Sequence, residues 1–184
     1  MRRLASTILL ALALGVAACG GDDGDGGDAK DPKDYASDFC GAAQEWVDAI
    51  RSGASDLGNL GTDATPEEGR DALGKFFDQT VKDTDDFAGE LDAAGAPDVS
   101  GGEDAAQELK DAVAQAKQIL EDARSKTEDL PVDDERAFAT EARKVGRSTR
   151  DSLSRVGDAI DEPRSSELRE AIRDTPGCQR LRQN

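Results

Sequence analysis

The chain has 184 residues, 40 acidic and 23 basic, with a net charge of −17 and no histidine. Without histidine it cannot form Ser-His-Asp or Cys-His catalytic arrangements or the Glu-x-x-His pairs of di-iron bundles, and it lacks the commonest zinc and copper ligand. No basic patch compensates the acidic charge, so we expect neither nucleic acid nor a polybasic contact with anionic lipid. We therefore expect a protein that is not an enzyme and holds no metal or cofactor.

Residues 1–18 have the composition of a cleaved export signal. Arg2 and Arg3 give a positive start, and the apolar run from Leu4 to Val16 follows. This run is shorter than the roughly 20 apolar residues that a permanent membrane-spanning helix needs. No second run of spanning length follows, so we expect the segment to be removed on export.

The signal ends in Val16-Ala17-Ala18-Cys19, with small residues directly before a cysteine. The motif resembles the lipobox of bacterial lipoproteins. The resemblance implies that Cys19 is lipidated, becomes the first residue of the mature chain and holds it at the outer face of the bacterial cytoplasmic membrane. The alternative is an ordinary signal peptidase site beside which Cys19 happens to lie.

Residues 19–31 form the next expected segment, a lipidated flexible tether. From Gly20 onward it reads GGDDGDGGDAKD, in which glycine gives flexibility and like charges favour extension. Asp23 and Asp25 fit the start of a calcium loop, but Gly27 then falls where a ligand is needed and Asp28 where the turn glycine belongs. We therefore interpret the segment as a tether without metal.

Residues 32–184 are expected to form a single helical domain. Apolar residues recur at alternating steps of four and three, as helices that pack side by side require, and nothing alternates at period two. Helix starts are expected at Asp31-Pro32, Thr65-Pro66, Ser100-Gly101-Gly102-Glu103 and Asp133-Asp134, and helix ends at Gly53, Gly95, Pro131 and Pro163. The pattern predicts an all-α, antiparallel up-down-up-down four-helix bundle, followed by one short C-terminal helix carrying Leu168 and Ile172.

Cys40 and Cys178 are expected to form a disulfide. Cys40 lies near the start of the first helix, and three reversals later the fourth helix ends at the same end of the bundle. The short C-terminal helix would then bring Cys178 beside Cys40. The alternative, a reactive thiol pair, lacks the CxxC spacing and a nearby histidine.

Two features could carry binding. The connection 53–64 places Leu57 and Leu60 among glycines, either as a partner-binding loop or as a cap on the end of the bundle. A cavity lined by Trp46, Phe77 and Phe87 would instead favour a ligand between the helices. Core packing is the simpler interpretation of Trp46 and Tyr35.

The whole pattern resembles the small secreted lipoproteins of actinobacteria. It combines the lipobox, a Gly/Asp tether, a first helix with Asp38-Phe39-Cys40-Gly41-Ala42-Ala43 and a late cysteine. The resemblance transfers no functional residues beyond Cys19, Cys40 and Cys178. We expect a non-enzymatic module that contacts another component of the cell envelope, or alternatively a carrier of a small apolar ligand.

The lipobox generates the first prediction. Replacing Cys19 by Ala should abolish labelling with a radioactive fatty acid, because the acylated thiol is gone, and should leave either unprocessed precursor or released protein. Labelling and detergent-phase partitioning of the export-competent chain measure both effects. Unchanged labelling in the Cys19→Ala chain would contradict the lipobox assignment.

Overall fold

A computed structural model describes residues 29–61, 63–161 and 165–183, so Cys19 and most of the expected tether lie outside the described residues. The described residues form helices and no strand, with one isolated bridge between Lys30 and Pro97. The helices are α1 (Pro32–Gly58), α2 (Pro66–Ala94), α3 (Gly102–Glu128), α4 (Glu135–Asp161), α5 (Ser166–Asp174) and α6 (Pro176–Gln183).

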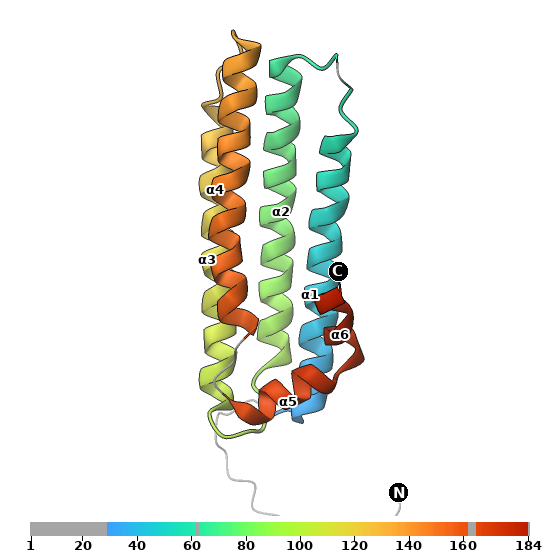
Figure 1. Ribbon diagram of the computed structural model, residues 1–184. Coiled ribbons are helices and arrows are strands. Elements are labelled where there is room, and N and C mark those ends of the chain that lie inside the picture. Colours follow the sequence, from blue (N-terminus) through green and yellow to red (C-terminus); the bar gives the residue numbers. More distant parts are fainter. Residues whose placement is uncertain (1–28, 62, 162–164, 184) are drawn as a thin grey trace, which may run out of the picture.

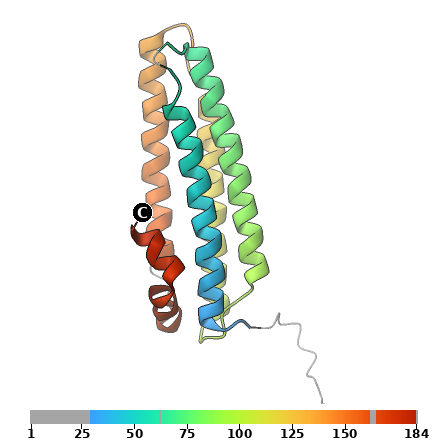
Figure 2. The same ribbon diagram turned by 90° about the vertical axis from the view of Figure 1, so that its right-hand side faces the viewer.

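The four long helices run antiparallel in an up-down-up-down bundle (Figures 1 and 2). The α1–α2 and α3–α4 connections lie at the upper end in Figure 1, and the α2–α3 connection lies at the lower end, where the described chain begins. This arrangement confirms the predicted fold class. The single short C-terminal helix expected from the sequence is instead two helices, because the extended backbone at Thr175 and the following Pro176 separate α5 from α6.

Most of the predicted helix starts are confirmed. The side chain of Asp31 accepts a hydrogen bond from the Lys33 N–H at 2.9 Å, and Thr65 and Glu68 form a reciprocal capping box. Asp134 accepts from two backbone N–H groups at the start of α4, and Ser165 caps α5. At these positions the capping residues in the sequence therefore mark the helix starts correctly.

The capping box predicted at Ser100 and Glu103 is wrong. Gly101 is the N-cap of α3, in the left-handed region at φ 72°, and no side chain caps this helix. A Cβ on the next residue, Gly102, would lie 2.0 Å from the Pro97 carbonyl oxygen. The tight turn between α2 and α3 thus requires the glycine pair itself, which removes Ser100 from the capping position.

The predicted end of the first helix at Gly53 is also wrong, since α1 continues to Gly58. A Cβ at Gly53 would lie 2.9 Å from the Phe76 ring of α2. Glycine serves here as a point of close approach between two helices, and the connection that follows is correspondingly shorter than predicted.

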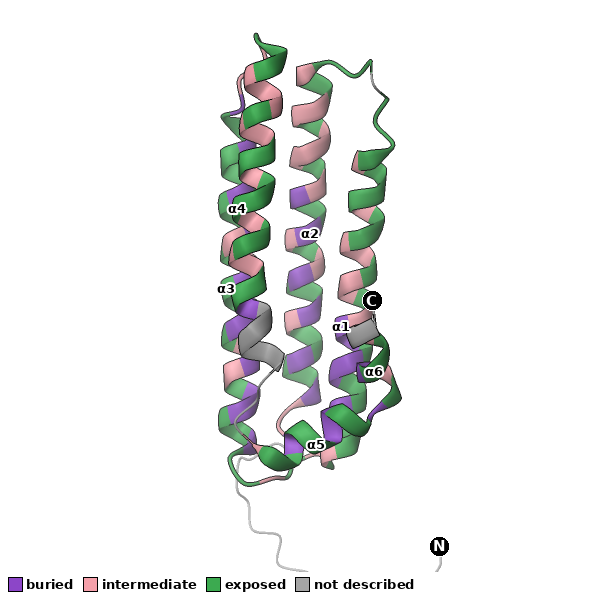
Figure 3. Ribbon diagram, in the orientation of Figure 1, coloured by how far each residue is buried: buried purple, intermediate pink, exposed green. Residues whose placement is uncertain are grey.

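The cover over α1 differs between its two halves. Its buried residues all lie between Tyr35 and Ala43, and residues 44–58 are half-buried or exposed (Figure 3). α2 packs along α1, α5 and α6 cover its lower half, and α4 packs on α3 rather than on α1. The upper half of α1 is therefore less covered than its lower half.

The apolar core is divided in the same way. The lower cluster includes Tyr35, Phe39, Phe87, Leu109 and Leu168, and it is well buried. A smaller upper cluster is built on Phe77, Leu120 and Ala123, with partly exposed apolar side chains packed against it from α2 and α4. Leu168 and Ile172, which the expected C-terminal helix carries, are both buried.

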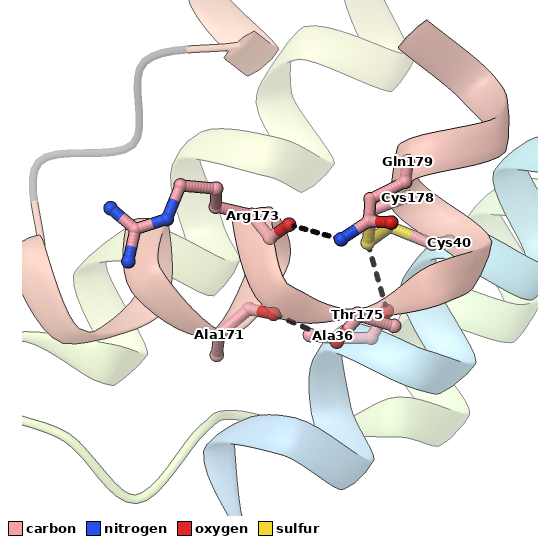
Figure 4. Close-up of a disulfide and its surroundings, with 7 residues drawn as sticks. All are labelled: Ala36, Cys40, Ala171, Arg173, Thr175, Cys178 and Gln179. Atoms are coloured by element: carbon pink, nitrogen blue, oxygen red, sulfur yellow. Dashed lines mark hydrogen bonds between the residues drawn. A yellow bond between two sulfur atoms is a disulfide. The ribbon is translucent and has the colours of Figure 1, made fainter. Parts of the chain in front are cut away.

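The predicted disulfide joins Cys40 of α1 to Cys178 of α6 (Figure 4). Their Cα atoms are 5.0 Å apart, and both residues are buried. The Cys178 sulfur also lies 3.6 Å from the Ala36 carbonyl oxygen, and the Thr175 hydroxyl donates to the Ala171 carbonyl at 2.7 Å. The end of the chain is thus held on α1 by a covalent bond within a packed site.

We predict that reducing this bond, or replacing both cysteines by Ser, lowers the free energy of unfolding by roughly 2–5 kcal/mol. The bond spans 138 residues, so its loss frees a long loop in the unfolded chain. Circular dichroism should retain the helical signal while the melting temperature falls. Alkylation of the protein isolated without reductant is the control, and labelling of both thiols would contradict the prediction.

Candidate functional site

An apolar groove opens between α1 and α4, and residues from all four long helices line it. Its volume is about 500 Å³, which lies within the range of small-molecule sites. The lining residues are Ile50 of α1, Phe76, Phe77 and Thr80 of α2, Leu120 of α3, and Gly146, Thr149, Arg150, Leu153 and Ser154 of α4.

The groove exists because α4 does not pack on α1, and α4 lines the space between them with small residues such as Gly146. A Cβ at Gly146 would meet no atom within 4 Å, so this position opens onto free space. Phe76 and Leu153 are only partly buried against the upper cluster. Apolar side chains that complete the core elsewhere therefore remain accessible at this face.

The α4 side of the groove is basic, which the sequence analysis missed. The eight residues 143–150 contain Arg143, Lys144, Arg147 and Arg150 and no acidic residue, and all four basic side chains are exposed. Lys144 lies 3.2 Å from a Glu141 carboxylate oxygen. Counting charge in short windows along the fourth helix would have found this stretch; the net charge of the chain concealed it.

Trp46, Phe77 and Phe87, which would favour a ligand carrier if they lined one cavity, do not line a common pocket among the described residues. Trp46 stacks on Phe87 with ring centroids 5.4 Å apart, and its indole N–H donates to the Thr84 hydroxyl at 2.9 Å. These two aromatic residues line a different groove, between α1 and α2, whose other lining includes Glu45, Asp83, Asp86 and Glu90. Of Trp46, Phe77 and Phe87, Phe77 alone lines the α1–α4 groove.

The core interpretation of the aromatic residues is confirmed for Tyr35, which is 1% exposed. Trp46 is half-buried and packs against the lower cluster. Their positions are explained by packing, so neither residue marks a ligand site by itself.

Leu57 and Leu60, the residues of the expected partner-binding loop, occupy different environments. Leu57 lies in the last turn of α1 and is half-buried, because that helix extends beyond Gly53. Leu60 follows the helix and is 40% exposed, the one large hydrophobic side chain among the described residues that is this accessible. The structure therefore leaves Leu60, and not the pair, as a candidate contact residue at the upper end.

The shifted pKa values do not favour acid–base chemistry. Burial raises the pKa of Tyr35 to about 12. Hydrogen bonds to Asp86 and Asp85 raise the pKa values of Lys82 and Lys117 on the surface. Each shift moves the group further from neutral pH, opposite to the direction that a general acid or base requires.

Within the described ranges, no cluster of three or more acidic or cysteine side chains is arranged to hold a metal ion. No helix in the same ranges is long and apolar enough to cross a bilayer. Cys19 and the signal lie outside these ranges. Comparisons of the chain with protein-family models, with curated proteins and with solved structures gave no match.

Proposed function

We propose that this protein is a non-enzymatic lipoprotein of the bacterial cell envelope that binds a small apolar ligand in the α1–α4 groove. The anchor is inferred from Val16-Ala17-Ala18-Cys19, as in the small secreted lipoproteins of actinobacteria that the chain resembles. The binding function is inferred from the groove. From the sequence we expected contact with an envelope partner, with binding of a small apolar ligand as the alternative. The groove supports the alternative, so we propose it first.

The groove is the observation that carries the proposal. Five of its ten lining residues are aromatic or aliphatic, its surface is mostly apolar, and it is open on one side between α1 and α4. Removing each 100 Å² of apolar surface from water stabilises a complex by about 2.5 kcal/mol. A ligand that completes the upper cluster would therefore gain from contacts that the chain itself leaves unmade.

Position 146 offers a way to fill the groove without disturbing the fold. We predict that Gly146→Leu weakens binding of the neutral fluorescent probe N-phenyl-1-naphthylamine at least tenfold, because the new side chain occupies the space beside Leu153. The substitution should also stabilise α4 by about 0.5–1 kcal/mol, since glycine is unfavourable inside a helix. Fluorescence titration and thermal melts of residues 20–184, which include every described residue, measure both effects.

Gly41→Leu is the matched control. A Cβ at Gly41 also meets nothing within 4 Å, but Gly41 lies on α1 outside the groove. This variant should bind the probe like the parent chain. Undiminished binding by Gly146→Leu, or no binding by the parent chain, would contradict the proposed function.

A second candidate function is contact with an envelope protein through the upper end of the bundle. Leu60 is the observation that favours it, since it is exposed at the end opposite the start of the described chain (Figure 1). An exposed leucine far from the proposed anchor is available to a partner approaching from outside.

We predict that Leu60→Ser reduces capture of such a partner, in a pulldown with the lipidated protein, without changing the melting temperature. Leu57→Ser is the comparison, because the half-buried Leu57 side chain should cost roughly 1 kcal/mol of stability when removed. If Leu60→Ser captures its partner fully, or destabilises the domain as much as Leu57→Ser, the loop does not bind a partner.

A further inference from the structure

The groove has one charged residue among those that line it, Arg150. The remaining lining side chains are apolar, hydroxyl-bearing or glycine. Arg150 is exposed and follows Thr149, one turn of helix from Gly146 and Leu153. Its guanidinium group therefore borders the apolar surface of the groove. A single cation at the edge of an apolar groove matches a ligand with an apolar body and one anionic group.

Arg150 has no carboxylate partner among the described residues, although acidic residues outnumber basic ones in this chain. Two lysines of α3 do have such partners on α2: Lys110 Nζ lies 2.8 Å from an Asp92 carboxylate oxygen, and Lys117 Nζ lies 2.6 Å from one of Asp85. Within the described chain, Arg143 and Arg147 resemble Arg150 in forming no ion pair. These three unpaired arginines all lie on α4, the helix that borders the groove.

Helix geometry places these arginines along one rim. At 100° per residue, Arg143 lies about 20° from Arg150 around the α4 axis, and Arg147 lies about 60° from it. They are displaced along the axis by roughly 10 Å and 4.5 Å respectively. The rim is therefore locally positive on a molecule whose net charge is −17, and this local charge would attract an anion.

We infer that the ligand of this groove is an anionic amphiphile, whose hydrocarbon part covers the apolar lining and whose carboxylate or phosphate group binds Arg150. A guanidinium forms two parallel hydrogen bonds to either group, which makes arginine suited to both. Arg143 and Arg147 add long-range attraction. This inference rests on the proposed function, because it specifies the class of ligand for the same groove.

Competition with the bound naphthylamine probe tests the inference on residues 20–184. The competitors are dodecanoate, dodecyl phosphate and dodecan-1-ol, which share a hydrocarbon chain and differ in the head group. We expect at least one of the two anions to displace the probe at a concentration tenfold or more below that of the alcohol. The stronger of the two identifies a carboxylate or a phosphate as the preferred group.

Arg150→Gln should remove this tenfold preference, measured as the ratio of the anion and alcohol concentrations that displace the probe from the same variant. Arg155→Gln is the matched control. It makes the same change of charge on the same helix, but position 155 lies about 140° around the axis from position 150. The control should keep the preference for the anion.

The outcomes separate the two proposals. If the alcohol competes as well as both anions, the groove binds apolar ligands and the inference about the head group is overturned. If Arg155→Gln reduces the preference as much as Arg150→Gln, the preference reflects net charge and the role of Arg150 is overturned. If the parent chain binds neither the probe nor any competitor, the proposed function itself fails.

Discussion

The way α1 is covered determines the rest of this structure. In a closed bundle, the fourth helix packs against the first along its whole length. Here α4 packs on α3, and the lower half of α1 is covered by α5 and α6, held there by the Cys40–Cys178 bond. Two short helices can cover only half of a 27-residue helix, so the upper half of α1 remains open toward α4. The groove is the direct result.

Local rules were sufficient for the four long helices and their order. The caps at Asp31, Thr65 and Asp134 and the four-three spacing of apolar residues predict four long helices, and the number of reversals brings Cys178 back to Cys40. The errors have a common cause. Gly53 and the glycines before α3 were interpreted as local signals, but they are required by tertiary contacts with Phe76 and Pro97 that lie far away in the sequence or across a turn.

The groove could not be predicted in the same way. Phe77, Leu120 and Leu153 follow the same apolar spacing as residues of the buried core, because periodicity shows which face of a helix is apolar and not whether a neighbour covers it. Coverage depends on which helices pack on each other, and here α4 packs on α3 rather than on α1. Arg150 was visible in the sequence, but its significance comes from the apolar residues that three other helices bring beside it.

The bridge at Lys30 fixes where the domain is attached. The Lys30 N–H donates to the Ala96 carbonyl at 2.9 Å, and its own carbonyl accepts from Asp98 at 2.7 Å, so the chain joins the bundle at the α2–α3 turn. Nine residues lie between Cys19 and Ala29, and the ten Cα–Cα steps from one to the other span at most about 35 Å. A lipidated Cys19, as we propose, would therefore confine the groove to a layer beside the membrane no deeper than about twice the length of the bundle. Within that layer the binding site has a high effective concentration toward anything that the membrane releases or receives.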